Sequence, residues 1–405
     1  MLERTMKKVI EQTSKSFPVL LLTGQRQIGK TTLLESMASG DRRYVSLDDL
    51  QARSLAKNDP NAFIQRYEPP VIIDEVQYAP ELFTYIKIHV DTRKQNGLFW
   101  LTGSQQYRLM RGIQESLAGR VAILDMLGLS YKEIIGRPFD GTPFWPSMDL
   151  THKKPLGGGL TVRELYEHIW NGSFPKPLVN KEVNRKLFYS SYIQTYISRD
   201  IKDFYNISNE LAFNNFLVAV AARTGQLLNY TNLANDADID QKTAKLWLSM
   251  LERTAIIQLL HPYSPNVTKR IVKTPKVYFL DTGLASYLTN WDSPDSLMTG
   301  AMNGQMLETW VFGEILKSFW HNGDEPAIYF YRDTNQKEID FVMEKNMTLY
   351  PIDVKKTTMP DRTDMKNFKN LDGLKKRVGT GAVICLYPGA IPIGENVISY
   401  PAWEI

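Results

Sequence analysis

The sequence contains a single cysteine, Cys385, among 405 residues. One cysteine can form neither an intramolecular disulfide nor a cysteine zinc site. No run of eighteen apolar residues is present, although a membrane-spanning helix needs about that length. Residues 1–17 form an amphipathic stretch that includes acidic residues, which argues against a signal peptide. These absences predict a cytoplasmic protein without a membrane segment.

Excess charge of either sign is also absent. The chain has 48 Lys and Arg against 44 Asp and Glu, so its net charge is only +4. This balance does not indicate nucleic-acid binding by itself. A hydrophobic content of 43% and a charged content of 23% are typical of a globular protein, and the length predicts two or three domains.

A phosphate-binding loop is the first motif in the chain. The apolar run from Val19 to Leu22 leads into GQRQIGKT at residues 24–31, and a helical pattern follows over residues 32–37. This matches GxxxxGK[ST] in the required strand, loop and helix context, and a chance match in a glycine-containing loop is the alternative for this motif alone. Backbone N–H groups and the helix N-terminus would bind the phosphates, the lysine would reach the β- and γ-phosphates, and the threonine hydroxyl would ligate Mg²⁺. The predicted ATP-binding residues are Gly24, Gln25, Gln27, Ile28, Gly29, Lys30, Thr31 and Thr32.

A second motif, VIIDE at residues 71–75, has the pattern of a strand that is buried on both faces of a parallel sheet. Asp74 would emerge at the carboxyl end of this strand, where α/β sheets bind ligands, and would hold Mg²⁺ together with Thr31. Glu75 is then placed to polarise the attacking water. The two motifs together predict an ATP and Mg²⁺ site.

A third predicted strand, residues 98–101, ends in Thr102-Gly103-Ser104-Gln105. Small polar side chains at this position would lie beside the γ-phosphate, and Ser104 is the candidate. An ordinary turn at a strand end is the alternative for this segment alone. The order of all three motifs favours nucleotide binding.

Five segments, GQRQIGKTTL, YVSLDDL, VIIDEVQ, LTGSQ and ESLAGRV, together resemble a large group of AAA-type ATPases of bacteria and archaea. Members of this group carry a C-terminal half known as a domain of unknown function. The resemblance implies an ASCE-type sheet with Ser104 or its neighbour as a sensor. It also implies a catalytic role for Arg120, either as a γ-phosphate sensor or as a finger offered to a neighbouring subunit of a homo-oligomer. A surface or domain-interface arginine is the alternative.

The composition shifts to Pro, Gly and Trp between residues 138 and 159, which indicates a linker between domains. Helical patterns follow over residues 161–170 and 181–203. The second of these contains Arg199-Asp200, which matches a signature of the same family. We interpret this pair as an ion pair that orients a helix, and a contact with the nucleotide domain is the alternative.

A helix-turn-helix pattern comes next, with a short helix over residues 227–235 and a longer one over residues 240–253. Asp240 is a good N-cap for the longer helix. Strand patterns at residues 255–261 and 276–280 supply what the wing of a winged helix would require. The residues of the longer helix predicted to face the core are Ala244, Trp247, Leu248 and Leu251.

The stretch from His261 to Leu280 is basic, with Lys269, Arg270, Lys273 and Lys276 and no acidic residue. A basic wing beside a recognition-type helix favours binding to the phosphate backbone of DNA. The competing interpretation is a winged helix that serves only for domain packing.

The C-terminal third predicts an amphipathic helix over residues 303–320, followed by strands at 327–331, 338–344 and 348–355, the last two as a hairpin. Helical Glu308, Asp340 on one strand, and Asp353-Val-Lys355 on the next are similar to the PD-(D/E)XK nuclease superfamily. The resemblance implies that Glu308, Asp340 and Asp353 hold Mg²⁺ while Lys355 orients the attacking water. An acidic hairpin could imitate the motif by chance, and for Glu338 a surface role is the better interpretation.

The sequence therefore predicts an α/β protein of three domains: an AAA-type P-loop ATPase domain (residues 1–145), a helical and winged-helix domain (146–290), and a restriction-endonuclease-like domain (291–405). The predicted function is ATP binding and hydrolysis coupled to an action on DNA. The alternative is a regulatory switch in which ATP occupancy recruits a protein partner and the nuclease-like domain is an inert scaffold.

Overall fold

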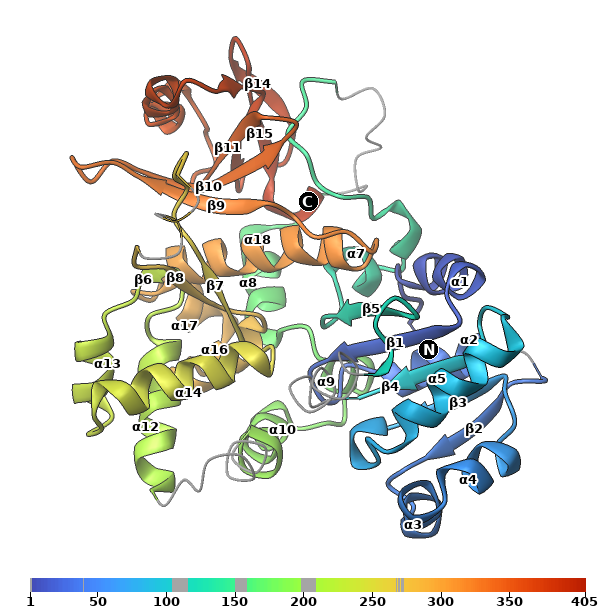
Figure 1. Cartoon of the computed structure of the whole chain (residues 1–405). Coiled ribbons are helices and arrows are strands. Elements are labelled where there is room, and N and C mark those ends of the chain that lie inside the picture. Colours follow the sequence, from blue (N-terminus) through green and yellow to red (C-terminus); the bar gives the residue numbers. More distant parts are fainter. Residues whose placement is uncertain are drawn as a thin grey trace.

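The computed structural model describes residues 2–38, 40–103, 116–149, 159–197, 209–266, 268, 270 and 273–405. The predicted sensor Ser104, the Arg199-Asp200 pair and Lys269 lie outside these ranges. Three sheets organise the described chain, and Figure 1 shows the N-terminal sheet at one side of the molecule and the C-terminal sheet at the opposite end.

A five-stranded parallel sheet forms the N-terminal part of the chain, in the order β2-β3-β4-β1-β5. Strand β4 lies between the P-loop strand β1 and the strand β3 that ends in Asp74, which confirms the predicted ASCE-type order. Alternate residues of β1 face opposite sides, so Leu20 and Leu22 enter one hydrophobic cluster while Val19 and Leu21 enter another. The strands are β1 (Val19–Gly24), β2 (Arg43–Ser46), β3 (Val71–Asp74), β4 (Phe99–Thr102) and β5 (Val121–Met126).

Short helices connect and flank these strands, and capping aspartates set the starts of α3 and α4. Asp49 accepts a hydrogen bond from the N–H of Ala52 at 2.7 Å, and Asp59 accepts one from Ala62 at 2.9 Å, so each carboxylate satisfies a free N–H of a helix. The helices are α1 (Lys7–Ser16), α2 (Lys30–Met37), α3 (Leu50–Asn58), α4 (Pro60–Arg66), α5 (Leu82–Arg93) and the short α7 (Tyr131–Ile134).

The middle of the chain is mainly helical. The helix expected from residue 181 begins later, because Asn184 caps α10 by accepting from the N–H of Leu187 at 3.0 Å, and a π-helical turn over Ile193–Ile197 follows it. The helices are α8 (Val162–Asn171), α9 (Pro175–Val179), α10 (Arg185–Tyr192), α12 (Glu210–Ala221), α13 (Tyr230–Asp236), α14 (Gln241–Arg253), α16 (Thr282–Leu288) and α17 (Pro294–Thr299).

Helix α14 has the predicted boundaries. Its N-cap Asp240 accepts hydrogen bonds from the N–H groups of Lys242 and Thr243 at 2.8 and 3.0 Å. The four apolar residues at helical spacing are all buried, as predicted: Ala244, Trp247, Leu248 and Leu251.

A small antiparallel sheet is formed by strands on both sides of α14 in the chain, in the order β6-β8-β7, with β6 (Gln226–Leu227), β7 (Ile257–Leu260) and β8 (Lys276–Phe279). The basic segment between β7 and β8 is not the free wing that the sequence predicts. Arg270 donates to the backbone oxygen of Ser264 at 2.6 Å and to Tyr329 Oη at 2.8 Å, and it pairs with Glu344 at 3.3 Å. Lys276 is 3% exposed. Two of the four cations that the sequence assigns to DNA, Arg270 and Lys276, are therefore engaged or buried within the chain and are not free to contact DNA.

The C-terminal sheet has seven strands, in the order β14-β15-β13-β11-β10-β9 with β12 beside β11. The predicted hairpin is confirmed as β10 and β11, and its turn residues Asn346 and Met347 both have positive φ, at 49° and 60°. Left-handed backbone at both turn positions matches the twist of the strands. The strands are β9 (Ile328–Arg332), β10 (Glu338–Lys345), β11 (Thr348–Val354), β12 (Arg377–Val378), β13 (Gly381–Cys385), β14 (Ile391–Gly394) and β15 (Val397–Pro401).

Helix α18 (Asn303–Trp320) crosses the centre of the molecule (Figure 1). It contacts β5 of the first sheet, α8, α16 and β8 of the middle segment, and β11 of the last sheet. One hydrophobic cluster consequently runs from Met6 to Ile405 through all three regions. Within the described ranges, no helix is both long and apolar enough to cross a membrane.

Candidate nucleotide site and carboxylate cluster

Glycine shapes the predicted phosphate loop at two positions. Gly24 ends β1 with φ at 136°, and a Cβ at this position would lie 2.1 Å from the backbone oxygen of Met126. Gly29 has φ at 90° and caps α2, and Gln27 between them is also left-handed at 61°. The loop therefore turns directly into the N-terminus of α2, where backbone N–H groups favour an anion.

Lys30 is held inside this loop. Its Nζ donates to the backbone oxygens of Gly24 and Gln25, at 2.9 and 2.6 Å, and the residue is only 6% exposed. The ammonium group thus lies across the loop, where it can exchange these carbonyl partners for phosphate oxygens, which are stronger acceptors.

Asp74 lies at the carboxyl end of β3, as predicted, and is surrounded by hydroxyl groups. Its Oδ1 accepts hydrogen bonds from Thr31 Oγ1 at 2.8 Å and from Thr102 Oγ1. Its Oδ2 lies 3.4 Å from both Tyr44 Oη and Ser46 Oγ. Carboxylate and hydroxyl oxygens are the donors that Mg²⁺ prefers, so these residues fit a Mg²⁺ ion.

Three of those hydroxyl groups, on Tyr44, Ser46 and Thr102, are not among the site residues predicted from the sequence. Ser46 and Thr102 end β2 and β4, the two neighbours of β3. Because parallel strands end at one edge of a sheet, the final residue of each neighbouring strand is the signal that could have found them.

Glu75 follows Asp74 with a left-handed backbone, at a φ of 54°. A non-glycine residue in this region costs free energy that the surrounding structure must supply, and such residues cluster at functional sites. Two contacts hold it: its N–H donates to Thr102 Oγ1 at 3.4 Å, and its Oε2 accepts from Gln77 Nε2. Gln77, which is buried, is a second site residue that sequence reasoning missed, although it lies inside the VIIDEVQ motif.

The position of Arg120 contradicts one prediction. It immediately precedes β5, whose Val121 pairs with Val19, whereas the P-loop end of β1 is at Gly24 opposite Met126. Six residues of strand span about 20 Å, so Arg120 lies at the opposite end of the sheet from the phosphate loop. Its role as a γ-phosphate sensor within the same chain is therefore wrong. Its guanidinium instead pairs with Asp91 at 2.6 and 2.9 Å on the surface.

A cavity of about 500 Å³ adjoins the phosphate loop. Three parts of the chain form it: the N-terminal segment, the start of α2, and α9 of the middle segment. Arg4 lines it and donates to the backbone oxygens of Ile28 at 3.1 Å and Leu127 at 2.7 Å, so the N-terminal segment is bonded to the P-loop. The lining residues include Leu2, Arg4, Lys7, Ile28, Leu33, Leu129, Lys176 and Val179.

A carboxylate cluster lies in the C-terminal sheet, where the hairpin brings Asp340 and Asp353 directly opposite each other. Asp353 Oδ1 accepts from the N–H of Asp340 at 3.0 Å, and Asp340 Oδ2 accepts from the N–H of Val354 at 2.8 Å. Lys355 Nζ lies 3.3 Å from Asp353 Oδ2. Asp353 is 1% exposed, and burial together with the charge of Asp340 raises its pKa to about 7.

Glu308 of α18 forms the other half of the cluster. Its Oε1 accepts hydrogen bonds from Lys276 Nζ at 3.0 Å and from Tyr278 Oη at 2.5 Å. Burial and the nearby charge of Asp340 raise the pKa of Glu308 to about 7. Glu338 is not the simple surface residue expected, because its Oε1 lies 2.6 Å from the same lysine nitrogen. Burial lowers the pKa of Lys276, but the carboxylates of Glu308, Asp340 and Glu338 outweigh it and raise the pKa.

The three predicted metal ligands Glu308, Asp340 and Asp353 are thus brought into one region, with Lys355 beside them. In the part of the chain that the structure describes, however, no group of three His, Cys, Asp or Glu is arranged so that it could hold a metal ion. Glu308 accepts hydrogen bonds from Lys276 and Tyr278 of β8. The two aspartates accept from backbone N–H groups, and Asp353 also pairs with Lys355.

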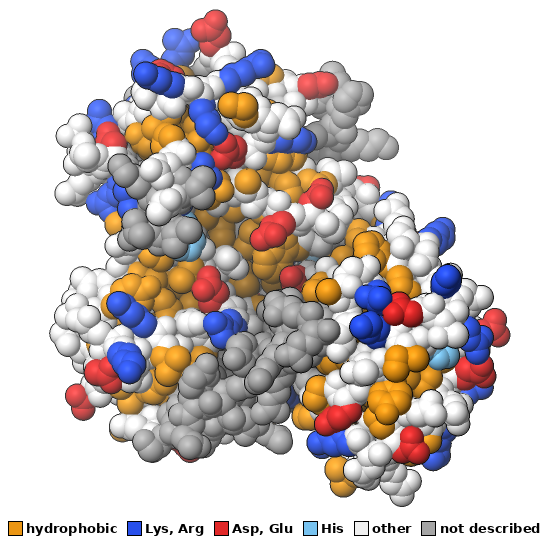
Figure 2. Space-filling model, viewed as in Figure 1, with side chains coloured by type: hydrophobic (Ala, Val, Ile, Leu, Met, Phe, Trp, Pro, Cys, Tyr) orange, Lys and Arg blue, Asp and Glu red, His pale blue; other side chains and the backbone are white. Residues whose placement is uncertain are grey.

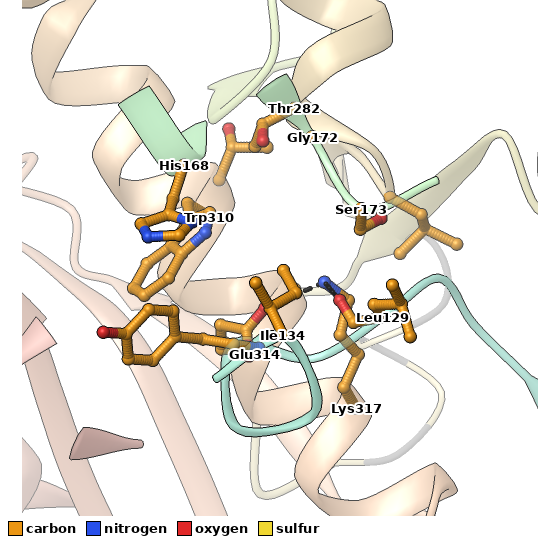
Figure 3. A pocket seen from close by; sticks show the side chains of 13 residues that line it. Leu129, Ile134, His168, Gly172, Ser173, Thr282, Trp310, Glu314 and Lys317 are labelled. Carbon is orange, nitrogen blue, oxygen red and sulfur yellow. Dashed lines mark hydrogen bonds and ion pairs between the residues drawn. The ribbon is translucent and has the colours of Figure 1, made fainter. Parts of the chain in front are cut away.

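The far half of α18 contacts the part of the chain that carries the phosphate loop. Glu314 Oε2 accepts from the N–H of Tyr131 at 2.8 Å, and Lys317 Nζ donates to Glu314 Oε1 at 2.8 Å and to the backbone oxygen of Leu129 at 3.0 Å. These groups border a small cavity of about 10 Å³, with His168 and Trp310 on one side (Figure 3). A polar space of this size holds about one water molecule.

Comparison with protein families gives three matches. Residues 16–135 match a model described as an AAA domain. Residues 162–295 match a domain of unknown function, DUF8612, and residues 303–404 match another, DUF4143.

Two relatives and one solved structure are similar to this chain. An uncharacterized protein of Mycobacterium tuberculosis is 26% identical over 392 residues, which cover 96% of this chain and 81% of the relative. An uncharacterized protein of Methanocaldococcus jannaschii is 22% identical, with coverage of 80% and 72%. The RuvB Holliday junction branch migration motor of Thermotoga maritima is 14% identical with a TM-score of 0.30, covering 65% of this chain and 90% of that one.

Proposed function

Because the chain joins an AAA-type P-loop domain to a C-terminal domain of unknown function, we propose that it is an ATP hydrolase. The observation that carries the proposal is the position of Asp74, whose carboxylate lies between the hydroxyl groups of Thr31 and Thr102 at the mouth of the phosphate loop. A Mg²⁺ ion bound by Thr31 and Asp74 would neutralise charge on the phosphates. The same edge of the sheet carries Glu75, the candidate base.

Each side chain has a separate task in this proposal. Lys30 leaves the carbonyl groups of Gly24 and Gln25 and binds the β- and γ-phosphate oxygens. Glu75, oriented by Gln77, accepts a proton from the attacking water. Thr102 holds both the Asp74 carboxylate and the N–H of Glu75, so one hydroxyl group links the metal ligand to the base.

The base of the nucleotide would occupy the cavity beside the loop. Its volume of about 500 Å³ lies within the range of small-molecule sites. Apolar Ile28, Leu33 and Leu129 can contact the faces of a purine, and Arg4 and Lys176 can contact polar groups of the ribose or phosphates. Since Lys176 belongs to α9, nucleotide would bridge the first and middle parts of the chain.

Removal of the loop cation tests ATP binding. Mg²⁺-ATP should raise the free energy of unfolding by about 2.7 kcal/mol at a hundredfold excess over Kd, and Lys30→Ala should abolish the accompanying thermal shift. Lys57→Ala is the matched control, because Lys57 is exposed on α3 away from the loop. A full shift in Lys30→Ala would refute the assignment of the phosphate loop.

A second candidate function is metal-dependent cleavage of DNA at the carboxylate cluster. The observation that favours it is the buried Asp353, opposite Asp340 and beside Lys355. Buried carboxylates that face one another need a cation or a proton. If Glu308, Asp340 and Asp353 released their present partners, their carboxylates could hold a divalent ion. Such an ion would supply Lewis-acid activation of water, and Lys355 would orient that water.

Supercoiled plasmid with Mn²⁺ or Mg²⁺, with and without ATP, tests this function. Wild-type protein should cleave the plasmid in at least one of these conditions and Asp353→Ala in none, while Asp372→Ala, which removes an exposed aspartate from the same domain, should behave as wild type does. If wild-type protein leaves the plasmid intact in every one of these conditions, the alternative of an ATP-dependent switch with an inert C-terminal scaffold is favoured.

DNA docking would use the winged-helix-like middle segment. Arg270 and Lys276 are engaged within the chain, so the exposed cations Lys242, Lys245 and Lys273 are the candidates for phosphate contacts. On the face in Figure 2, Lys and Arg side chains of the described residues are interspersed with acidic ones. Neutralising the three candidates should lower the salt slope by about 0.9 for each lost contact with duplex DNA. An unchanged slope would leave the segment with a packing role.

Arg120 could still act between subunits, as an arginine finger in a homo-oligomer. Mixing Arg120→Ala protein with Lys30→Ala protein tests this, because only a shared site would combine an intact Lys30 with an intact Arg120. Recovery of ATPase activity in the mixture supports the role, and absence of recovery leaves Arg120 as the surface partner of Asp91.

A further inference from the structure

Lys276 reaches from the middle segment into the C-terminal domain. It is the first residue of β8, the central strand of the small sheet, yet its ammonium group lies among carboxylates of α18 and β10. The nitrogen is 3.0 Å from Glu308 Oε1 and 2.6 Å from Glu338 Oε1, and the side chain is 3% exposed. A cation is therefore already built into the carboxylate cluster.

Strand β8 contributes a second donor to the same oxygen. Tyr278 lies two residues after Lys276 and therefore projects from the same face of the strand. Its hydroxyl group donates to Glu308 Oε1 at 2.5 Å. One carboxylate oxygen thus accepts from both β8 side chains, so a metal ion could bind it only if these donors withdrew.

The electrostatic consequence is that a lysine takes the position of a metal. Burial of several carboxylates without a cation would be costly because they repel one another and lose hydration. Lys276 offsets that cost on the Glu308 side, and Lys355 offsets it at Asp353. With these lysines in place, no three His, Cys, Asp or Glu side chains in the described ranges, this cluster included, are arranged so that they could hold a metal ion.

We propose that Lys276 is a built-in counter-cation that excludes divalent metal from the carboxylate cluster until β8 moves away from α18. The inference rests on the metal-dependent function proposed above and adds its regulation. The nuclease-like site would be closed by default, and withdrawal of the lysine would uncover Glu308 for Mg²⁺ or Mn²⁺.

The small sheet also offers a route by which nucleotide could move the lysine. Gln25 of the phosphate loop donates through Nε2 to the backbone oxygen of Ala255, which lies just before β7. Strand β7 pairs with β8 from Ile257 opposite Phe279 to Leu260 opposite Lys276. The P-loop contact and the lysine are therefore at opposite ends of one two-stranded ladder, and a tilt of this ladder would displace both.

Mn²⁺ titration of the full-length chain, followed by calorimetry or by the electron paramagnetic resonance of free Mn²⁺, tests the proposal. Lys276→Met removes the charge and keeps the length of the side chain. It should bind Mn²⁺ at least about tenfold more tightly than wild type, equivalent to about 1.4 kcal/mol. Adding Asp353→Asn should abolish the gained binding, which assigns it to this cluster. Lys276→Arg, which keeps the positive charge, should bind as wild type does.

Two results would overturn the proposal in different ways. If wild type and Lys276→Met bind Mn²⁺ equally, with binding lost in Asp353→Asn, the metal site stands and only the role of the lysine is lost. If neither binds, the metal-dependent function falls as well. The ATP-induced thermal shift, which depends on Lys30, shows in every variant whether the chain is folded. Lys276→Gln, whose uncharged amide can still donate hydrogen bonds, replaces Lys276→Met if that variant does not fold.

Discussion

The smallest scale at which function can be tested is the single side chain, and Glu75 is the most informative one. Glu75→Gln keeps the shape and hydrogen bonding of the side chain but cannot accept a proton. We expect ATP to bind with nearly unchanged affinity and turnover to fall by about 10² or more. Steady-state hydrolysis and the ATP-induced thermal shift, measured on the same preparation, separate the two effects.

Gln77→Leu is the companion variant. It removes the amide that Glu75 Oε2 accepts from, while the carboxylate remains. Turnover should therefore fall less than in Glu75→Gln, because the base is present but poorly oriented. Equal turnover in wild type and Glu75→Gln would show that another residue activates the water.

His321 predicts a dependence of stability on pH. It is 1% exposed, and burial lowers its pKa to about 4, although the carboxylate of Glu133 at 3.5 Å opposes the shift. In the unfolded chain its pKa is about 6.5. Between these two pH values the unfolded state binds more protons than the folded state. The contribution of His321 to the free energy of unfolding is therefore fully present above pH 6.5 and is lost as the pH falls toward 4. The loss amounts to up to about 3 kcal/mol.

Urea unfolding between pH 5 and 7.5 measures this effect. In His321→Gln the free energy of unfolding should depend less steeply on pH than in wild type, since the titrating group is gone. His89→Gln, on the partly exposed α5, is the control and should alter the slope less. Identical slopes in His321→Gln and wild type would assign the acid sensitivity to other groups.

At the scale of whole elements, two aspartate N-caps allow a matched comparison. Asp240 caps α14 at the surface with two backbone hydrogen bonds. Asp281 caps α16 but is 1% exposed and also accepts from the N–H and hydroxyl of Ser173 and from Tyr189 Oη. Replacement of Asp240 by Ala should cost about 1 kcal/mol. Replacement of Asp281 should cost about 3 kcal/mol or more, because buried donors lose their acceptor.

Chemical denaturation of the two variants gives both costs in one experiment. Similar losses would show that the buried hydrogen bonds around Asp281 add nothing beyond the cap. If Asp240→Ala lost more free energy of unfolding than Asp281→Ala, burial would not be what makes an aspartate cap costly to remove.

The elements also show which parts of the fold can be predicted from local sequence. Helix α14 and the β10–β11 hairpin follow from their periodicity and capping residues, since all the determining groups lie within a few residues of one another. Lys276 could not be predicted in this way. Its partners Glu308 and Glu338 lie 32 and 62 positions later in the chain. The basic residues near Lys276 in the sequence therefore indicate DNA binding, whereas the residues around it in the folded chain are acidic.

The candidate sites follow the same division. Lys30, Thr31, Asp74 and Glu75 were predicted because each lies in a motif whose spacing fixes its place at a strand end. Thr102 and Gln77 lie within the same motifs, but only the fold shows that they hold Asp74 and Glu75. Arg120 was misplaced because the resemblance supplies a role without saying at which end of β5 the residue lies.

For the whole molecule, the continuity of the core predicts cooperative unfolding. One hydrophobic cluster includes Met6, Ile169, Phe312 and Ile405 and so connects the first, middle and last regions. Although chains of this length often unfold in several steps, differential scanning calorimetry should show a single main transition. ATP should move that whole transition upward. Two resolved peaks, of which ATP shifts only one, would show that the regions unfold independently.

The position of α18 has a consequence for protein engineering and for the exchange of parts between related genes. A chimera that took residues 303–404 from a relative would import the helix together with its far end. The imported residues at positions 314 and 317 would then have to fit the resident backbone at Leu129 and Tyr131. The imported residue at position 308 would have to fit the resident Lys276 and Tyr278. The borders that separate families in sequence are therefore poor places to cut this protein, and a viable graft would carry β8 and the segment after β5 with the helix.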